Sequence, residues 1–280
     1  MSQSAPLQKE HVVKTIKVCG PALVGCFGIL GGQDWKLDRT NPNGFDHILN
    51  VLPDEVQRLW MPVPTKADAT IALSPEFKKE VQKDGKTVMG KCFADGVFIP
   101  KGEAFAITSA DCPTVAMYDR KERHMLCFHA GRDSLFDRSV LLSGISGTPS
   151  REHFSVVHNA LSLFRELGVL PEDIFMNLFC GIRTGFQHQR HHFMYGEYNS
   201  SLLNWCRRYE GALVNENITD EIDLHAIVRG QAIECGVPSQ HIHFDGIDTY
   251  HDTWTGRHLW ASARSDPRKK KRNLVLVHHR

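Results

Sequence analysis

The chain has 280 residues, of which 41% are hydrophobic and 9% aromatic. That apolar share is enough for a sizeable core, and so it excludes a disordered chain. Lys and Arg number 33 against 32 Asp and Glu, which gives a formal net charge of +1. This balance provides no basic field to hold nucleic acid, so a nucleic-acid partner is not expected.

The eight cysteines form no CxxC pair and show no zinc-finger spacing. In a chain this long they indicate reduced thiols in a cytoplasmic protein. Residues 18–32 are apolar and follow several lysines, as a targeting signal would. The segment is shorter than the ~20 residues of a membrane helix. Its glycines and proline, and the missing A-x-A-like cleavage site, also argue against a signal peptide. No membrane partner is therefore expected.

The first third of the chain mixes apolar runs with turn residues. Apolar runs predict strands over residues 12–18 and 23–30, followed by a turn at residues 31–32. Residues 54–60 have helical spacing, with Asp54 as the expected N-cap. Residues 75–81 also predict a short helix, which the turn signal Lys83-Asp84-Gly85 ends.

The remaining two thirds predict a run of short strands and then alternating helices and strands. The expected strands cover residues 87–89, 96–99, 104–109, 114–118, 124–129, 174–180, 242–244 and 274–277. The expected helices cover residues 151–167, 200–209 and 222–235. We therefore predict an α+β fold, with a mostly antiparallel sheet flanked by helices. No linker is evident, so we expect a flexible N-terminus over residues 1–10 and one domain over residues 11–280.

A cysteine and a histidine each lie at the end of a predicted strand. Cys112 follows the strand over residues 104–109, and His129 ends the strand over residues 124–129. If these two strands are neighbours, the thiol and the imidazole lie side by side. Ala110, Ala130 and Gly131 surround them with little side-chain bulk, which leaves room for a substrate.

Such a pair can support two kinds of chemistry. The imidazole can assist a nucleophilic thiolate, or both groups can ligate zinc, which then activates water. A third possibility is that Cys112 is an ordinary buried thiol and His129 a hydrogen-bonded core histidine.

Several segments, in order along nearly the whole chain, resemble motifs of the laccase-domain family, also called multicopper polyphenol oxidase-like or YfiH-like. Residues 109–112 (SADC) resemble its T/S-A-D-C motif, and residues 129–131 (HAG) resemble its H-A-G-W motif. Further similar segments are residues 25–32, 94–97 (ADGV), 223–242 and 260–266 (WASARSD).

The resemblance implies a YfiH-like single-domain fold with a small metal site. It implies zinc, held by one Cys and two His, with copper as the older attribution. It implies activity on purine nucleosides, by phosphorolysis with phosphate or by adenosine deamination. Cys112 and His129 would be the catalytic and metal-binding residues, with Asp111 also catalytic. The expected substrate-binding residues are Asp95, Arg183 and Arg264.

This chain departs from the family pattern at several positions. The second family histidine lies in a Q-V-H-G segment, which we match to residues 80–85, where Gln82 or Asp84 would have to replace it. Glutamine is a poor zinc ligand. Arg132 stands where the family has the tryptophan of H-A-G-W. The retained Cys112 and His129 therefore also fit a metal-free dyad.

Two further segments have functional and non-functional interpretations. Residues 188–192 (HQRHH) resemble a metal cluster but are also typical of a surface loop near a pocket. Residues 268–272 (RKKKR) fit a solvated hairpin tip, or else a nucleic-acid or nuclear-import patch.

Three hypotheses of function follow from these observations. The first is a zinc-assisted purine nucleoside phosphorylase or deaminase with Cys112 and His129 as ligands. The second is a metal-free cysteine hydrolase or deamidase that uses the Cys112–His129 dyad. The third is a degenerate family member that binds ligands without catalysis.

Overall fold

The computed structural model describes residues 14–29, 34–37, 44–64, 69–73, 76–90, 92–136, 155–183, 188–191, 193–214, 220–263 and 271–280. No helix within these ranges is both long and apolar enough to cross a membrane.

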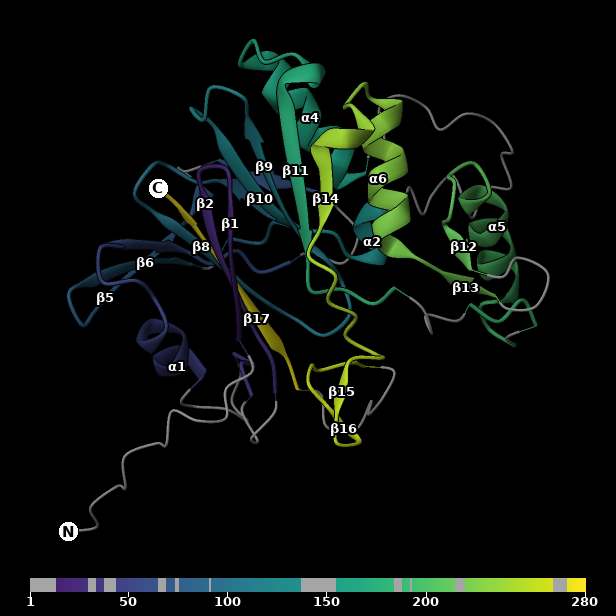
Figure 1. Cartoon of the computed structure of the whole chain (residues 1–280), viewed down its shortest axis with the longest axis horizontal. Helices are drawn as coiled ribbons and strands as arrows, with labels where there is room; N and C mark the ends of the chain where they lie inside the picture. The colour runs from purple at the N-terminus through teal and green to yellow at the C-terminus, as the bar shows by residue number, and fades with distance from the viewer. Residues whose placement is uncertain are drawn as a thin grey trace.

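Two large sheets form the body of the fold (Figure 1). The first has the strand order β1-β2-β17-β8-β3-β6-β5. Its strands are β1 (Lys14–Cys19), β2 (Ala22–Phe27), β17 (Asn273–His279), β8 (Ala104–Ser109), β3 (Arg58–Trp60), β6 (Lys86–Gly90) and β5 (Lys79–Lys83). The second has the order β14-β11-β9-β10-β7-β4. Its strands are β14 (Ile242–Phe244), β11 (Ile174–Phe179), β9 (Thr114–Asp119), β10 (Met125–His129), β7 (Gly96–Phe98) and β4 (Ile71–Ala72).

Helices and two small hairpin-like sheets complete the described chain. The small sheets pair β12 (Leu213–Val214) with β13 (Glu221–Ile222), and β15 (Thr253–Trp254) with β16 (Arg257–His258). The α-helices are α1 (Gly44–Asn50), α2 (Arg132–Leu135), α4 (Val156–Glu166), α5 (Gly196–Cys206) and α6 (Leu224–Glu234). Short 3₁₀ turns cover Pro171–Asp173 and Ser239–His241.

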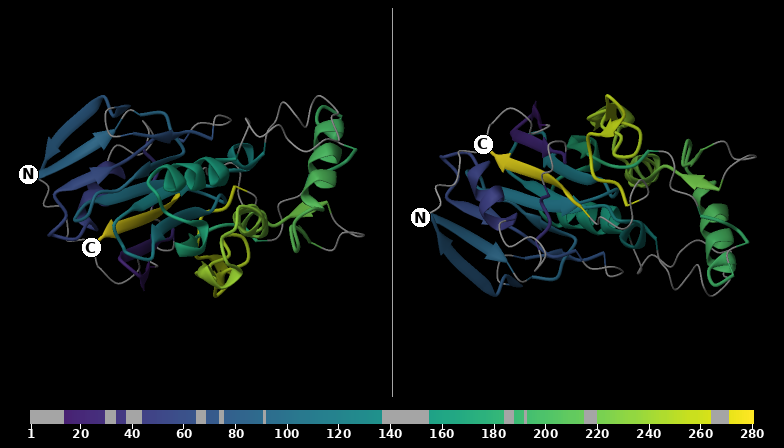
Figure 2. Two further views of the ribbon diagram at one scale, coloured as in Figure 1. Left: turned by 90° about the horizontal axis from the view of Figure 1, so that it is seen from above. Right: turned by 90° about the horizontal axis from the view of Figure 1, so that it is seen from below.

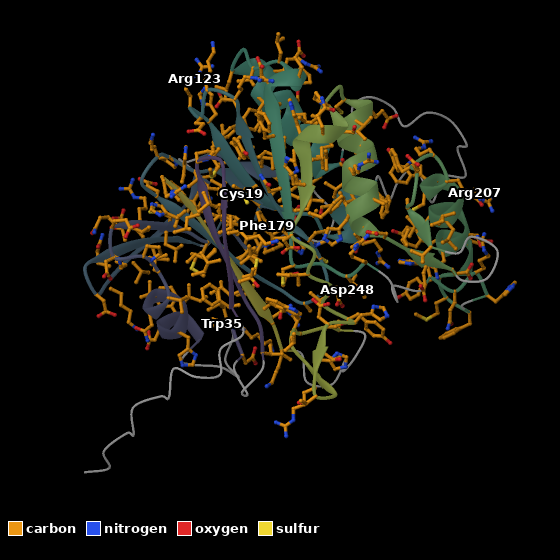
Figure 3. All side chains as sticks on the ribbon, viewed as in Figure 1. Cys19, Trp35, Arg123, Phe179, Arg207 and Asp248 are labelled. Atoms are coloured by element: carbon orange, nitrogen blue, oxygen red, sulfur yellow. The ribbon has the colours of Figure 1, made fainter. Side chains whose placement is uncertain are left out.

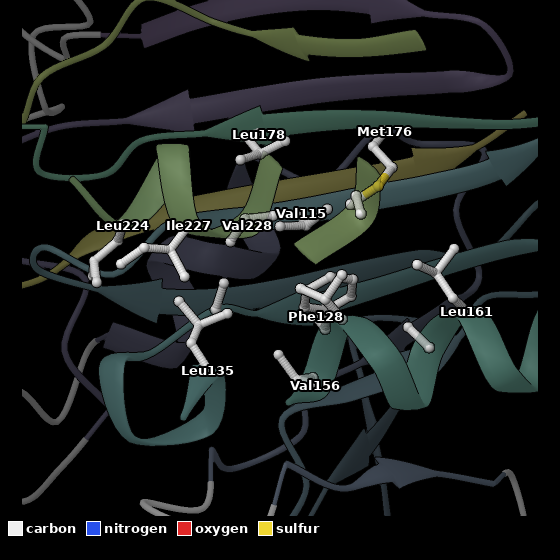
Figure 4. Packing of buried hydrophobic residues seen from close by; sticks show 14 of the residues in the cluster. Val115, Phe128, Leu135, Val156, Leu161, Met176, Leu178, Leu224, Ile227 and Val228 are labelled. Carbon is white, nitrogen blue, oxygen red and sulfur yellow. The ribbon is translucent and has the colours of Figure 1, made fainter. Parts of the chain in front are cut away.

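The large sheets pack face to face, and helices cover their outer faces. Strand β17 shows the reason, because its side chains alternate between the two faces of the sheet. Val275 and Val277 pack between the sheets, whereas Leu274 and Leu276 pack against the α1 side. On the second sheet, outward-facing side chains such as Phe128 pack against α2, α4 and α6 (Figure 4). The core therefore has three apolar layers, one between the sheets and one outside each.

Helix α5 and the β12–β13 pair stand apart from the two sheets (Figure 2). Trp205 of α5 makes an edge-to-face contact with Phe136, which directly follows α2, at a centroid distance of 4.8 Å. This contact fixes α5 beside the end of α2.

The α+β prediction and the mostly antiparallel pairing are confirmed. The strands predicted in the centre of the chain, and the helices at α4, α5 and α6, are confirmed with small shifts of their ends. Parallel pairing occurs only between β3 and β6, β3 and β8, β4 and β7, and β11 and β14 among the described strands. The N-terminal segment 1–10 and the predicted turn at residues 31–32 lie outside the described residues.

The predicted helix over residues 54–60 is wrong. Arg58–Trp60 is strand β3, which lies between β6 and β8 and pairs in parallel with both. Leu59 and Trp60 are buried, so strand pairing and burial outweigh the local helical pattern. The helix of this region is α1, further toward the N-terminus.

The predicted helix over residues 75–81 is also wrong. Lys79–Lys83 is strand β5, which forms a hairpin with β6. Asp84 and Gly85, with φ of 50° and 73°, form the turn that the sequence predicted there. An Asp-Gly pair with positive φ at both residues favours a two-residue hairpin, so the turn signal determines the structure on both sides of it.

Candidate active site

Cys112 lies where the chain crosses from one large sheet to the other. Strand β8 belongs to the first sheet and β9 to the second, so residues 110–113 connect the two. The Ser109 hydroxyl donates to the Cys112 carbonyl at 2.9 Å, and the Ala130 N–H donates to the Pro113 carbonyl at 2.8 Å. These bonds fix the crossing, and they leave the Cys112 side chain partly exposed.

His129, at the end of β10, lies beside this crossing. It pairs with Thr114, the first residue of β9, which comes shortly after Cys112. The next residue, Ala130, bonds to Pro113 next to Cys112, so the two segments lie side by side. The backbones of Cys112 and His129 are therefore close, but not as neighbouring strands β8 and β10, because these are in different sheets. It is β9 that brings Cys112 to His129.

Asp95 lies next to the His129 ring. Its carbonyl accepts the His129 backbone N–H at 2.7 Å, and its Oδ1 is 3.6 Å from His129 Nδ1. Gly96 allows this approach, because a Cβ there would lie 2.5 Å from the Phe128 Cβ. The Asp95 side chain is fully buried, whereas that of His129 is 15% exposed. Asp95 is therefore placed to orient His129, and its expected part in substrate binding stays a prediction.

The surroundings of His129 favour its protonated form. Burial lowers its pKa, but the charges of Cys112 and Asp95 raise it more, so that its pKa rises from 6.5 to about 9. At neutral pH an imidazolium therefore lies near both a cysteine and a carboxylate. This is the arrangement of a thiol, a base and an orienting acid in cysteine-dependent enzymes.

The absence of a side chain at Gly131 leaves room for the His129 ring. A Cβ at this position would lie 2.7 Å from His129 Cε1. The backbone of Gly131 has φ −70° and ψ 153°, which any residue can adopt, so the requirement is for space alone.

We expect Gly131→Ala to lower the turnover of the enzyme by about 10²-fold, because a small displacement of an acid–base group has effects of that order. Steady-state kinetics and thermal unfolding would measure the effect. Gly90→Ala is the control, since a Cβ there meets nothing within 4 Å. Equal activity of both variants would contradict the importance of the ring position.

Asp111, predicted as catalytic, connects the segment between β8 and β9 to the C-terminal part of the chain by hydrogen bonds. Its carboxylate accepts the Thr249 hydroxyl at 3.1 Å and the Ala263 N–H at 2.9 Å. Its carbonyl accepts the Ile182 N–H at 2.8 Å. Asp111 is buried and is bonded to three segments that are distant in sequence. These contacts position the backbone next to Cys112.

Of the other predicted site residues, Arg183 follows Ile182, which bonds to Asp111 next to Cys112, and Arg264 lies outside the described chain. Arg183 is half exposed, with its Nε 3.7 Å from Oδ2 of Asp223, the N-cap of α6. Arg264 and most of the basic run 268–272 lie outside the described residues, as does His192. His188 is buried and lies next to Arg132.

The sequence showed Arg132 only as a departure from a family pattern. Its Nη1 is 3.4 Å from His188 Nε2, and its Nε donates to Asp133 at 2.9 Å. The ring of Tyr198 on α5 faces the guanidinium at 5.7 Å. His188 and Tyr198 are far from Arg132 in the sequence, and no local pattern predicts their contacts with it.

The residues near Cys112 do not fit a zinc or copper centre. Catalytic zinc takes three protein ligands, and in the described part of the chain no group of three or more His, Cys, Asp or Glu residues could hold a metal ion. Gln82 lies on β5 at the sheet edge, where its Nε2 donates to Glu80 and Thr87. Strands β3 and β6 separate β5 from β8, so Gln82 lies away from Cys112 and does not complete a ligand set there.

Comparisons with known proteins agree with this fold. The model of a family described as multi-copper polyphenol oxidoreductase laccase matches residues 79–266. The YfiH structure from Bacillus licheniformis is similar with a TM-score of 0.60 at 16% identity, over 92% of this chain and 93% of that one. YlmD from Geobacillus stearothermophilus gives 0.58 at 18% identity, over 93% of each chain. A Neisseria meningitidis protein gives 0.54 at 16% identity, over 96% of this chain and 98% of that one. No curated protein matches the chain.

Proposed function

Since the chain belongs to the multi-copper polyphenol oxidoreductase laccase family, we propose that it is an enzyme whose reactive group is the Cys112 thiolate. His129 transfers protons and Asp95 orients it. The observation that carries the proposal is the position of the Cys112 segment directly beside His129, with a fully buried carboxylate facing the imidazole. Nucleophile, base and orienting acid in this order are the parts of a thiol-dependent hydrolase.

The proposed reaction is hydrolytic removal of an amino group from a purine nucleoside, the substrate class that the family resemblance implies. The Cys112 sulfur forms a bond to the carbon that carries the amino group, and the electron pair moves to the ring nitrogen. Protonated His129 gives its proton to the amine, the C–N bond breaks, and ammonia leaves. Water then attacks the same carbon while His129 takes its proton, and the C–S bond breaks to restore the thiolate. The balance is adenosine plus water to inosine plus ammonia.

Phosphorolysis of the glycosidic bond is the second candidate. The positive charge of Arg132 beside the site favours it, because phosphate would be bound there as an anion. This reaction releases a free base and a ribose phosphate and needs no bond to sulfur.

One experiment separates the two reactions. The purified full chain is incubated with adenosine, with and without phosphate, and the products are identified by chromatography. Inosine and ammonia formed without phosphate support the proposal. Adenine formed only with phosphate would replace it with phosphorolysis, and neither product would contradict both.

We further expect the activity to persist in the presence of a metal chelator. Cys112 and His129 are two donors, and zinc on two protein ligands is weakly held and easily removed. Elemental analysis should accordingly give less than one zinc per chain. Gln82→His should leave zinc affinity unchanged, because position 82 lies on the far hairpin. Loss of activity with chelator, restored by zinc, would contradict this expectation.

A further inference from the structure

The guanidinium of Arg132 is held in place next to the catalytic pair. Arg132 begins α2 directly after Gly131, so it follows closely on His129. Asp133 accepts a hydrogen bond from its Nε at 2.9 Å, and His188 Nε2 faces its Nη1 at 3.4 Å. The Tyr198 ring covers one side of the group at 5.7 Å. Contacts at two nitrogens and one face leave the group little freedom to turn.

One end of this guanidinium is available to a ligand. Within the described part of the chain, Arg132 Nη2 makes no hydrogen bond. The side chain is 31% exposed, so it is neither free in solvent nor sealed in the core. A guanidinium that is oriented in advance binds a planar or tetrahedral oxyanion with two N–H groups at small entropic cost.

The chain itself places the group near the thiol. Arg132 follows His129 by three residues, and His129 pairs with Thr114, which comes two residues after Cys112. An anion bound at Nη2 can therefore be part of a molecule that reacts at the sulfur. The charge of Cys112 also helps to raise the pKa of Arg132, after the larger effects of burial, which lowers it, and of Asp133 and Tyr198, which raise it. Arg190, two residues after His188, already pairs with Asp220 at 2.8 Å.

We propose that Arg132 determines specificity by binding an oxyanion of the substrate, a phosphate group, while the substrate reacts at Cys112. This inference rests on the proposed function for the place of the reaction. The resembled family has tryptophan at this position, and an indole offers a flat apolar face where a guanidinium offers charge. The phosphate can be an ester on a nucleotide or a free ion bound beside a nucleoside.

The test measures binding without turnover. Calorimetry with inorganic phosphate, AMP and adenosine is carried out on the full chain, on Arg132→Gln and on Arg132→Lys. We expect Arg132→Gln to weaken phosphate and AMP binding by at least tenfold, with adenosine binding unchanged. Arg132→Lys should weaken phosphate and AMP binding less than Arg132→Gln does, because lysine keeps the charge but not the bidentate geometry. AMP binding tighter than adenosine identifies the ester, whereas joint binding of phosphate and adenosine identifies the free ion.

A matched control is Arg123→Gln. Arg123 pairs with Asp119 in the turn between β9 and β10. This turn is at the far end of the strands from Phe179, which lies opposite Thr114 (Figure 3). The control should bind all three ligands as the unmodified chain does. Phosphate and AMP binding that is absent, or equal in Arg132→Gln and the control, would overturn the inference.

A further variant separates this inference from the proposed function. Cys112→Ser should lose turnover but retain phosphate binding. If Cys112→Ser stays active while Arg132→Gln fails to bind phosphate, the proposed mechanism fails and the anion site stands. If phosphate binding is unaffected in Arg132→Gln while Cys112→Ser is inactive, the anion site fails and the mechanism stands.

Discussion

Replacing Cys112 by serine should lower deamination of adenosine by on the order of 10³-fold or more, as is usual when the nucleophile of a coupled catalytic group is removed. The loss should be in turnover, because a bond to sulfur forms only during the reaction. Folding should be little affected, since Cys112 is partly exposed and its backbone carbonyl keeps the bond from Ser109. Product chromatography and thermal unfolding would measure the two effects.

Cys19→Ser is the control, because Cys19 is also a free and partly exposed cysteine but lies on β1 of the first sheet. The substitution at Cys112 has a second signature. The charge of Cys112 is the leading cause that raises the His129 pKa to about 9, so this pKa should fall well below 9 in Cys112→Ser. NMR titration of the imidazole would detect the change. Activity retained by Cys112→Ser would leave the second candidate, phosphorolysis, as the better account.

Local signals in the sequence were sufficient for most of the fold. Short apolar runs between turn residues predicted the central strands, and Asp84-Gly85 predicted the turn of the β5–β6 hairpin. Gly168 and Gly236, with φ of 75° and 97°, follow α4 and α6 as expected of residues after a helix. In these places the local preference and the final structure agree.

The errors arose where distant segments decide the structure. Trp60 belongs to a strand because β6 and β8 pair with it from both sides, and both follow it in the chain. The division of the strands into two sheets could likewise not be predicted from the sequence. For this reason we predicted that Cys112 and His129 meet, but attributed the meeting to β8 rather than to β9.

The candidate site shows the same limit. Cys112 and His129 could be identified as chemically active residue types at strand ends. The part of Asp95 depends on the pairing of β7 with β10 and on its full burial, which no local pattern encodes. Arg132 obtains its orientation from His188 and Tyr198, which approach from the segment around α5. Asp95 and Arg132 could be singled out in the sequence, but their contacts could not be predicted from it.

Asp95→Asn should lower turnover by on the order of 10²–10⁴-fold, the range seen when the acid that orients a catalytic histidine becomes an amide. Asparagine has nearly the same volume, so the buried position stays filled. The substitution removes a negative charge that raises the pKa of His129. That pKa should therefore fall below its value of about 9.

The direction of the pH effects follows from this shift. His129 must be protonated to release ammonia, so activity is lost as pH rises through its pKa, and this alkaline limb should move to lower pH in Asp95→Asn. The free energy of unfolding should depend on pH in the same direction. A pKa raised from 6.5 to about 9 stabilises the fold fully below 6.5, and this contribution is lost as pH rises through 9. In the variant the loss should begin at lower pH.

Rate profiles and urea unfolding, each between pH 6 and pH 10, would measure both effects. The control is Asp173→Asn, whose carboxylate pairs with Arg120 at the surface near the start of β11, away from His129. It should shift neither profile. An alkaline limb in Asp95→Asn at the same pH as in the unmodified chain would show that Asp95 does not act through His129. A normal rate with a shifted limb would limit Asp95 to tuning the imidazole, because orientation of the ring would then survive without the carboxylate.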